Sequence, residues 1–179
     1  MQQNKTTTTV TTIIFIAIIY LISLFQFHVS SPIGDPFVQL GEVFGILGIL
    51  FLGLKLGLVS SLVGILLANI MTNPQFFYLP MFEMLLIALV ANFLFKILGR
   101  QARWTTLITV ALGCGITKII TTFLHYFIQA IIVSGGRTSI GVMTAFTAMP
   151  AGIITAILLV IIVPIMYFML QKTIFKNFD

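Results

Sequence analysis

Long apolar runs that almost no charged residue interrupts dominate this chain. Hydrophobic residues make up 59% of its 179 residues and charged residues only 7%, whereas roughly 25% of the residues in a soluble domain are charged. So few charges could not cover the surface of a water-soluble globule. The runs are continuous, without the alternation of membrane β-strands, which favours helices. The sequence therefore predicts an all-α membrane protein.

Turn-forming residues divide the apolar sequence into six segments. A helix needs roughly 20 apolar residues to cross the hydrocarbon, so a chain of 179 residues has room for about six spans and for no soluble domain. The segment 53–57 contains two glycines and predicts a tight turn between the second and third spans. We expect a single transmembrane domain, residues 1–179, with spans at about residues 10–28, 37–54, 57–71, 78–98, 104–133 and 145–170.

The basic residues outside the spans predict the orientation of the bundle. Cytoplasmic loops carry an excess of Lys and Arg. With six spans and a cytoplasmic N-terminus, Arg137 alone lies outside, and both termini are cytoplasmic. The basic residues then placed inside are Lys5, Lys55, Lys96, Arg100, Arg103, Lys172 and Lys176. This asymmetry predicts the orientation of a multi-pass protein in its membrane, and the position of these residues at span ends argues against a nucleic-acid partner.

Charged and polar residues inside the spans are the candidate functional residues, because a charge at membrane depth is costly and usually functional. Glu42, Glu83 and Lys118 are the charged ones. Lys118, Thr122, His125 and Gln129 follow the spacing i, i+4, i+7, i+11, which places them on one helix face. Polar residues of the same outer half complete the candidate set for substrate binding: Gln39, Glu42, Asn73, Tyr78, Glu83, Lys118, His125 and Gln129.

Two interpretations of this set remain open. Glu83 and Lys118 could pair and only hold the bundle together. Alternatively, the outer ends of spans four to six form a pocket for a small solute, with residues 30–36 as a lid and Tyr78 stacked on a ring of the ligand. We also expect Tyr126 and Tyr167 to lie at the membrane interface, where aromatic residues are enriched.

The chain carries no motif that would supply energy or catalysis. It has no G-x-x-x-x-G-K-[ST] loop for ATP, no H-E-x-x-H and no Cys/His cluster for a metal. No internal repeat of the kind common in secondary transporters is evident. We therefore expect a non-catalytic protein without cofactors. Small residues that let helices approach closely predict a docking face for a partner at Ala17, Gly41, Gly45 and Gly57.

Several short motifs resemble those of a transporter family. They are FVQLGEVF at residues 37–44, LGLKLGLV at 52–59, Ala68-Asn69, and AMPAGII at 148–154. Together they resemble the substrate-binding S components of energy-coupling factor (ECF) vitamin transporters. The pattern is most similar to the hydroxymethylpyrimidine or pyridoxine subgroup, with thiamine and riboflavin as alternatives. The sequence departs from the family pattern in three places. Ile13 and Leu21 flank Ala17 where alanine is usual, Asn69 replaces an acidic residue, and Glu83 and Met84 stand early in span four where a lysine is expected.

The resemblance implies a multi-pass protein of the plasma membrane, of bacterial type, and a division of labour between subunits. This chain would capture a water-soluble vitamin at the outer face and topple in the membrane to deliver it inward. A transmembrane coupling subunit and two cytoplasmic ATPases would supply the work. Rival interpretations are a lipid-modifying membrane enzyme and a small channel or scaffold.

Overall fold

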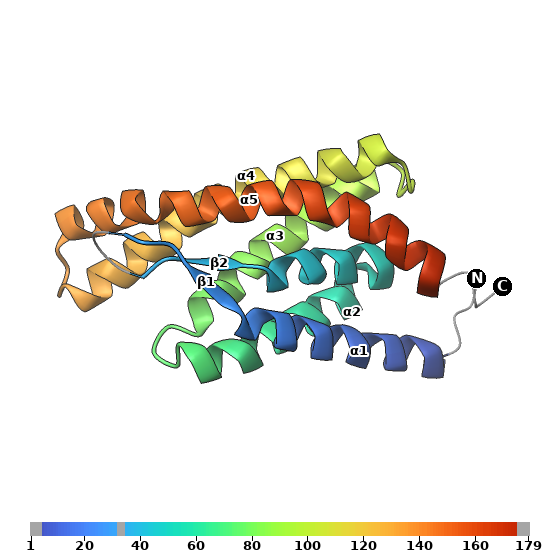
Figure 1. Cartoon of the computed structure of the whole chain (residues 1–179), viewed down its shortest axis with the longest axis horizontal. Coiled ribbons are helices and arrows are strands. Elements are labelled where there is room, and N and C mark those ends of the chain that lie inside the picture. Colours follow the sequence, from blue (N-terminus) through green and yellow to red (C-terminus); the bar gives the residue numbers. More distant parts are fainter. Residues whose placement is uncertain (1–4, 32–34, 175–179) are drawn as a thin grey trace.

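The computed structural model describes residues 5–31 and 35–174, so residues 32–34 of the expected lid lie outside the described part. In the described part, five helices are long and apolar enough to cross a membrane. Most of them run roughly along the long axis of the molecule (Figure 1). The start of the first helix, α1 (Lys5–Leu24), lies at the same end of the bundle as the end of the last helix, α5 (Thr138–Ile174). The all-helical membrane architecture expected from the sequence is thus confirmed.

A short β-hairpin follows the first helix, α1 (Lys5–Leu24). Strand β1 (Gln26–His28) pairs antiparallel with β2 (Phe37–Gln39), with Phe27 opposite Val38. The expected helical spans 10–28 and 37–54 are corrected here, since their facing ends are extended. Non-helical backbone at membrane depth needs protein partners for its polar groups. The Phe37 N–H donates to the Tyr126 hydroxyl at 3.2 Å, and the Gln39 N–H donates to Thr155 Oγ1 at 3.4 Å.

The helix α2 (Gly41–Thr72) is folded back on itself at Gly53. Gly53 has φ +79° and ψ 175°, a backbone conformation that glycine adopts without steric penalty. Ser61 donates to the Gly45 carbonyl at 3.1 Å, although a straight helix would separate these residues by about 24 Å. The tight turn expected at residues 53–57 therefore separates two packed halves, residues 41–52 and 54–72.

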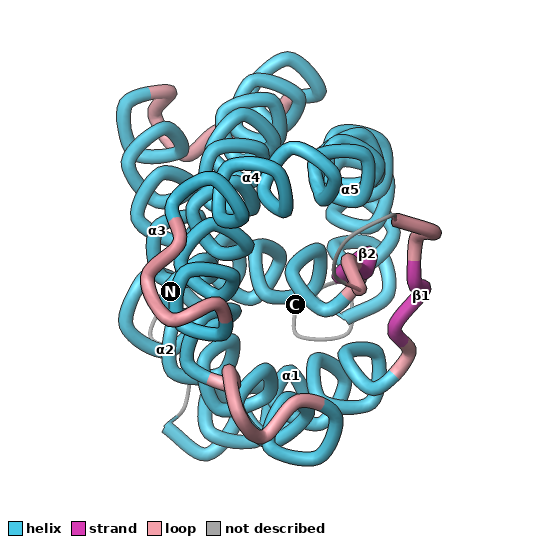
Figure 2. Tube along the Cα trace, turned by 90° about the vertical axis from the view of Figure 1, so that its left-hand side faces the viewer, coloured by secondary structure: helices cyan, strands magenta, loops and turns pink. Residues whose placement is uncertain are grey.

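The remaining helices are α3 (Tyr78–Ile97), α4 (Trp104–Val133) and α5 (Thr138–Ile174). The last helix starts at Thr138, before the expected residue 145, and it contains Pro150 and Pro164. Proline removes one backbone donor, but neighbouring helices and local adjustments compensate for such losses in membrane helices. Helix α4 packs along α5, and α1 packs along α2. Figure 2 looks along the bundle and shows the β-hairpin between α1 and α5.

Glycines at the centre of the bundle allow its helices to touch. A Cβ on Gly57 would lie 2.4 Å from the Ile49 Cα, and a Cβ on Gly45 would lie 2.8 Å from the Met84 methyl group. A Cβ on Gly41 would lie 1.8 Å from Ser23 Oγ. These three residues of the expected docking face are therefore buried among helices of the same chain, and of that set only Ala17 is exposed.

Candidate functional site: a buried ion cluster

Lys118, in the middle of α4, lies at the centre of a buried polar cluster. Its Nζ donates to Glu42 Oε1 at 2.8 Å, to Gln39 Oε1 at 3.1 Å and to Glu83 Oε2. An ammonium group has three N–H donors, so all of them are used. The three acceptors come from the first turn of α2, the strand β2 and the second turn of α3. One lysine thus joins segments that lie far apart in the sequence.

Glu83 extends the cluster to His125, which lies on the same face of α4 as Lys118 and two helix turns further along. Its Oε2 accepts from Lys118, and its Oε1 accepts from His125 Nδ1. Because Nδ1 contacts a carboxylate oxygen, it carries the hydrogen, which leaves Nε2 as the free ring nitrogen. The His125 ring stacks on Tyr126 at a centroid distance of 4.7 Å. Both Glu83 oxygens are therefore satisfied within the protein.

The cluster is almost completely shielded from solvent. Relative exposure is 1% for Glu42, 2% for Glu83, 3% for Lys118 and 4% for His125. Removing one partner from a buried ion pair typically destabilises a protein by about 3–5 kcal/mol, because the other charge stays buried and unpaired. The cluster therefore stabilises the junction of α2, α3 and α4 as well as forming a candidate site. Both interpretations left open by the sequence find support in this arrangement.

Two atoms at the ends of the cluster have no hydrogen-bond partner among the described residues. They are Glu42 Oε2 and His125 Nε2. Thr122 Oγ1 on α4 and Thr144 Oγ1 on α5 are also buried without a partner. Buried polar groups are nearly always hydrogen-bonded, and exceptions need an explanation. A bound molecule that brings its own polar groups is one such explanation.

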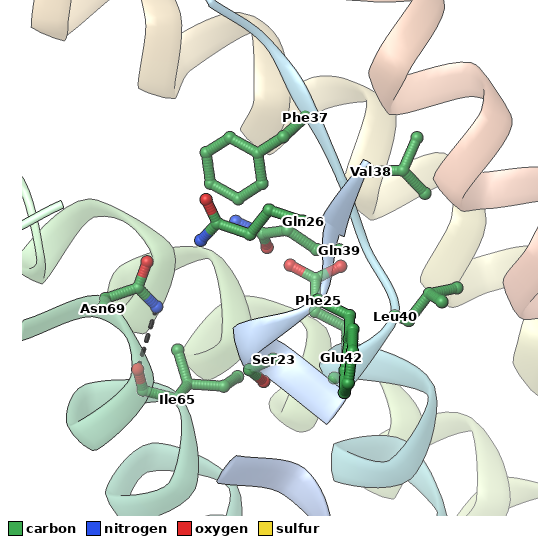
Figure 3. Close-up of a pocket in the computed structure, with 11 residues that line it drawn as sticks. Ser23, Phe25, Gln26, Phe37, Val38, Gln39, Leu40, Glu42, Ile65 and Asn69 are labelled. Carbon is green, nitrogen blue, oxygen red and sulfur yellow. Dashed lines mark hydrogen bonds between the residues drawn. The ribbon is translucent and has the colours of Figure 1, made fainter. Parts of the chain in front are cut away.

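A small cavity lies beside Glu42, between the end of α1, the strand β2 and the second half of α2 (Figure 3). The centre of a water molecule can occupy about 10 Å³ of it, which is room for about one water molecule. Ser23, Gln39, Glu42 and Asn69 contribute polar atoms to its lining. The cavity is thus small, only partly polar and adjacent to the ion cluster.

The structure brings together five of the eight expected binding residues and leaves the other three apart. Gln39, Glu42, Glu83 and His125 all join Lys118 directly or through Glu83. The other three lie elsewhere: Gln129 is half-buried one helix turn beyond His125, Asn73 caps α2, and Tyr78 is 43% exposed with its ring edge against Phe77.

Counting Lys118 itself, five expected residues form the cluster, and the helical spacing on α4 led to the correct face. Tyr126 was expected at the membrane interface but is 6% exposed, and its hydroxyl accepts from the Phe37 N–H. Tyr167 is also buried, stacked on Phe51 at 4.5 Å. Tyr126 follows Lys118 by eight residues, so the same helical spacing indicates its position. No sequence signal indicates Ser23, which reaches the cavity only because α1 packs along α2.

These observations describe a buried, charge-paired site in which Glu42 Oε2 and His125 Nε2 have no partner among the described residues. No protein-family model, curated protein or solved structure matches the chain. The function must therefore be argued from the cluster and its surroundings.

Proposed function

We propose that this chain is a substrate-binding membrane subunit of the ECF type, which captures a small, ring-containing, water-soluble vitamin. The observation that carries the proposal is the buried cluster around Lys118, whose end atoms Glu42 Oε2 and His125 Nε2 have no partner among the described residues. Intramembrane ionisable groups that face the bundle interior commonly mark substrate pathways. The resemblance of the short motifs to ECF S components supports the same function.

The proposed topology has six crossings with both termini in the cytoplasm. The fold at Gly53 divides α2 into two antiparallel halves, which supports one crossing more than the number of long helices. Residues 41–52 alone would be only about 18 Å long, so the strand β2 contributes to this crossing. The start of α1 and the end of α5 lie at one end of the bundle (Figure 1), which supports an even number of crossings.

The chemistry of the free atoms favours a ligand with hydrogen-bond donors. A carboxylate oxygen only accepts, and the free Nε2 of a neutral histidine also accepts. Hydroxymethylpyrimidine and pyridoxine carry hydroxyl donors on a flat ring, and thiamine and riboflavin are the alternatives. His125 and Thr122 are the residues of α4 that we assign to direct contact with the ligand, with Glu83 and Lys118 holding His125 in position.

Energy would come from partner subunits. The proposal includes a transmembrane coupling subunit and two cytoplasmic ATPases, and it assigns no catalytic step to this chain. Ala17, exposed on α1, is the residue of the expected docking face that remains available to a partner.

Ligand binding by the purified chain tests the proposal. We expect the chain alone, in detergent, to bind one vitamin of the tested panel in isothermal titration calorimetry, and to yield the same compound in mass spectrometry of co-purifying molecules. His125→Ala should weaken binding about five- to a hundredfold, since leaving a buried donor of the ligand without its acceptor costs about 1–3 kcal/mol. His28→Ala is the matched control, because His28 is exposed on β1.

The same experiment separates the rival functions. If the folded chain binds no vitamin and none co-purifies, the binding-subunit proposal fails. Lipid turnover by vesicles that contain only this chain would then identify an enzyme, and ion flux through them would identify a channel.

A further inference from the structure

An apolar groove lies on the surface of the bundle between α4 and α5, which pack along each other (Figure 1). Its volume is about 300 Å³, and only glycine, alanine, valine, leucine and isoleucine line it. Two small buried residues form its floor, where a Cβ on Gly115 would lie 3.4 Å from the Ala156 Cβ. Large exposed residues form its rim: Leu112 and Ile116 of α4, and Ile157 and Ile161 of α5. The groove therefore suits an apolar occupant.

The groove leads towards the end of the bundle at which α4 begins. Trp104, the first residue of α4, is 53% exposed and contacts Phe168 of α5, with the ring centroids 4.6 Å apart. Tryptophan is enriched at membrane interfaces. Leu112 and Gly115 lie about 12 Å and about 16 Å further along the helix than Trp104. Half of the hydrocarbon core is about 15 Å thick, so a lipid tail whose head group is level with Trp104 is long enough to reach the groove.

Basic residues lie at this same end. Arg103 directly precedes Trp104, and Lys172 follows Phe168 by one helix turn. Because Trp104 and Phe168 are in contact, Arg103 and Lys172 both lie at the end of the groove. Both side chains are exposed, and neither forms an ion pair with a described residue. Their charges are therefore available to an anionic group.

The acidic residues of the described part lie elsewhere. Within residues 5–31 and 35–174 they are Asp35, Glu42 and Glu83. Glu42 and Glu83 are buried and pair with Lys118, and Asp35 lies 3.5 Å from His28 in the β-hairpin that follows the far end of α1. Basic residues beside a membrane span attract anionic lipids. The head group that fits this end of the groove is thus anionic.

We propose that the groove and its basic end form a binding site for one anionic phospholipid. Arg103 and Lys172 bind its phosphate, and one acyl chain lies between α4 and α5 on Gly115 and Ala156. A membrane helix of another protein would also cover an aliphatic groove, but it would not account for the unpaired basic residues at its end. In the proposed topology this end is cytoplasmic, and the cytoplasmic leaflet is rich in anionic lipids. The inference does not depend on the proposed vitamin, since the lipid site shares no residue with the ion cluster.

Native mass spectrometry of the full chain in detergent tests the head-group contacts. The chain is titrated with phosphatidylglycerol and with phosphatidylcholine that carry the same dioleoyl chains. We expect one phosphatidylglycerol to stay bound at concentrations at which phosphatidylcholine is lost. Arg103→Gln should weaken this binding about fivefold and its combination with Lys172→Gln about thirtyfold, since each basic residue contributes about 1 kcal/mol. Arg137→Gln is the matched control, because Arg137 is exposed in the loop at the other end of α4 and α5 and should keep full binding.

A second pair of variants tests the acyl chain. Leu112→Trp places a large side chain at the rim of the groove and should cause loss of phosphatidylglycerol binding. Leu89→Trp is its control and should bind normally, since Leu89 lies on α3 outside the groove. Leu112 is 48% exposed and Leu89 46% exposed, so both variants should fold, and their melting temperatures verify this.

Four results would overturn the proposal. Equal retention of phosphatidylcholine would show that the head group is not recognised, and unchanged binding by Leu112→Trp would show that the groove holds no chain. Displacement of the lipid by glycerol phosphate alone would identify a site for free anions. Efficient disulfide cross-linking of an Ile116→Cys variant to a second copy in phosphatidylglycerol nanodiscs would show that the groove holds a helix.

Discussion

Ser60 and Ser61 in α2 and Lys118 in α4 are all buried polar residues, yet they find their partners at different distances along the chain. Ser60 and Ser61 both donate to the Gly57 carbonyl, three and four residues earlier. Lys118 contacts Glu83 and Glu42, which are 35 and 76 residues away. A hydroxyl group can be satisfied by its own helix. An ammonium group needs a counter-charge, which only tertiary packing can bring to it.

In the first region the described residues satisfy every serine hydroxyl, and in the second they leave some polar atoms without a hydrogen-bond partner. The serine region leaves no free serine hydroxyl, whereas the Lys118 cluster ends in two free atoms, Glu42 Oε2 and His125 Nε2. The local hydrogen bonds of Ser60 and Ser61 support the packing of the two halves of α2 against each other. Long-range bonding holds three segments together and leaves two polar atoms without a partner among the described residues. Substitutions in the two regions should therefore differ in size and in what they affect.

The largest effect is expected for Lys118→Met. It would leave Glu42 and Glu83 buried without their cation, which should destabilise the fold by about 3–5 kcal/mol. The measurement is the yield of monodisperse protein and its melting temperature in detergent. Lys96→Met is the matched control, because Lys96 is exposed near the end of α3. Equal stability of both variants would show that the cluster contributes little to folding, and the comparison above would fail.

A smaller loss is expected for Gly57→Ala in the serine region. The added Cβ would lie 2.4 Å from the Ile49 Cα, so backbone has to move, and overpacking typically costs about 1–3 kcal/mol. Ala17→Leu serves as a contrast, since Ala17 is exposed on α1 and should keep its stability. Assembly of the Ala17 variant with a coupling subunit tests the docking face separately. Normal melting of Gly57→Ala would mean that the two halves of α2 have room to separate.

The smallest effect is expected for Ser61→Ala. It removes a hydroxyl that donates to the Gly45 and Gly57 carbonyls, both of which belong to the helix α2. A single hydrogen bond contributes about 0.5–1.5 kcal/mol net. Unfolding in mixed detergent micelles should detect a loss of about 1 kcal/mol, with ligand binding unchanged. A loss as large as that of Lys118→Met would remove the distinction between local and long-range bonding.

The sequence by itself determined the class of the protein and the most important helix face. Its apolar runs and scarce charges require a membrane environment, because each backbone group in lipid must be satisfied within a helix. The spacing of Lys118, Thr122 and His125 indicated a buried polar face, since helical periodicity is local. The glycines at residues 53–57 indicated the turn within α2 for the same reason.

Only the tertiary structure decided which residues meet. Three features depend on segments that are distant in sequence: the pairing of Glu42 and Glu83 with one lysine, the cavity that Ser23 and Asn69 both line, and the strand at residues 37–39. From the sequence alone, Gly41 and Gly45 could pack against a partner protein or against helices of the same chain. In the structure they pack against helices of the same chain. The physical reason is that a residue type fixes what contact a side chain requires, while the fold fixes which group supplies it.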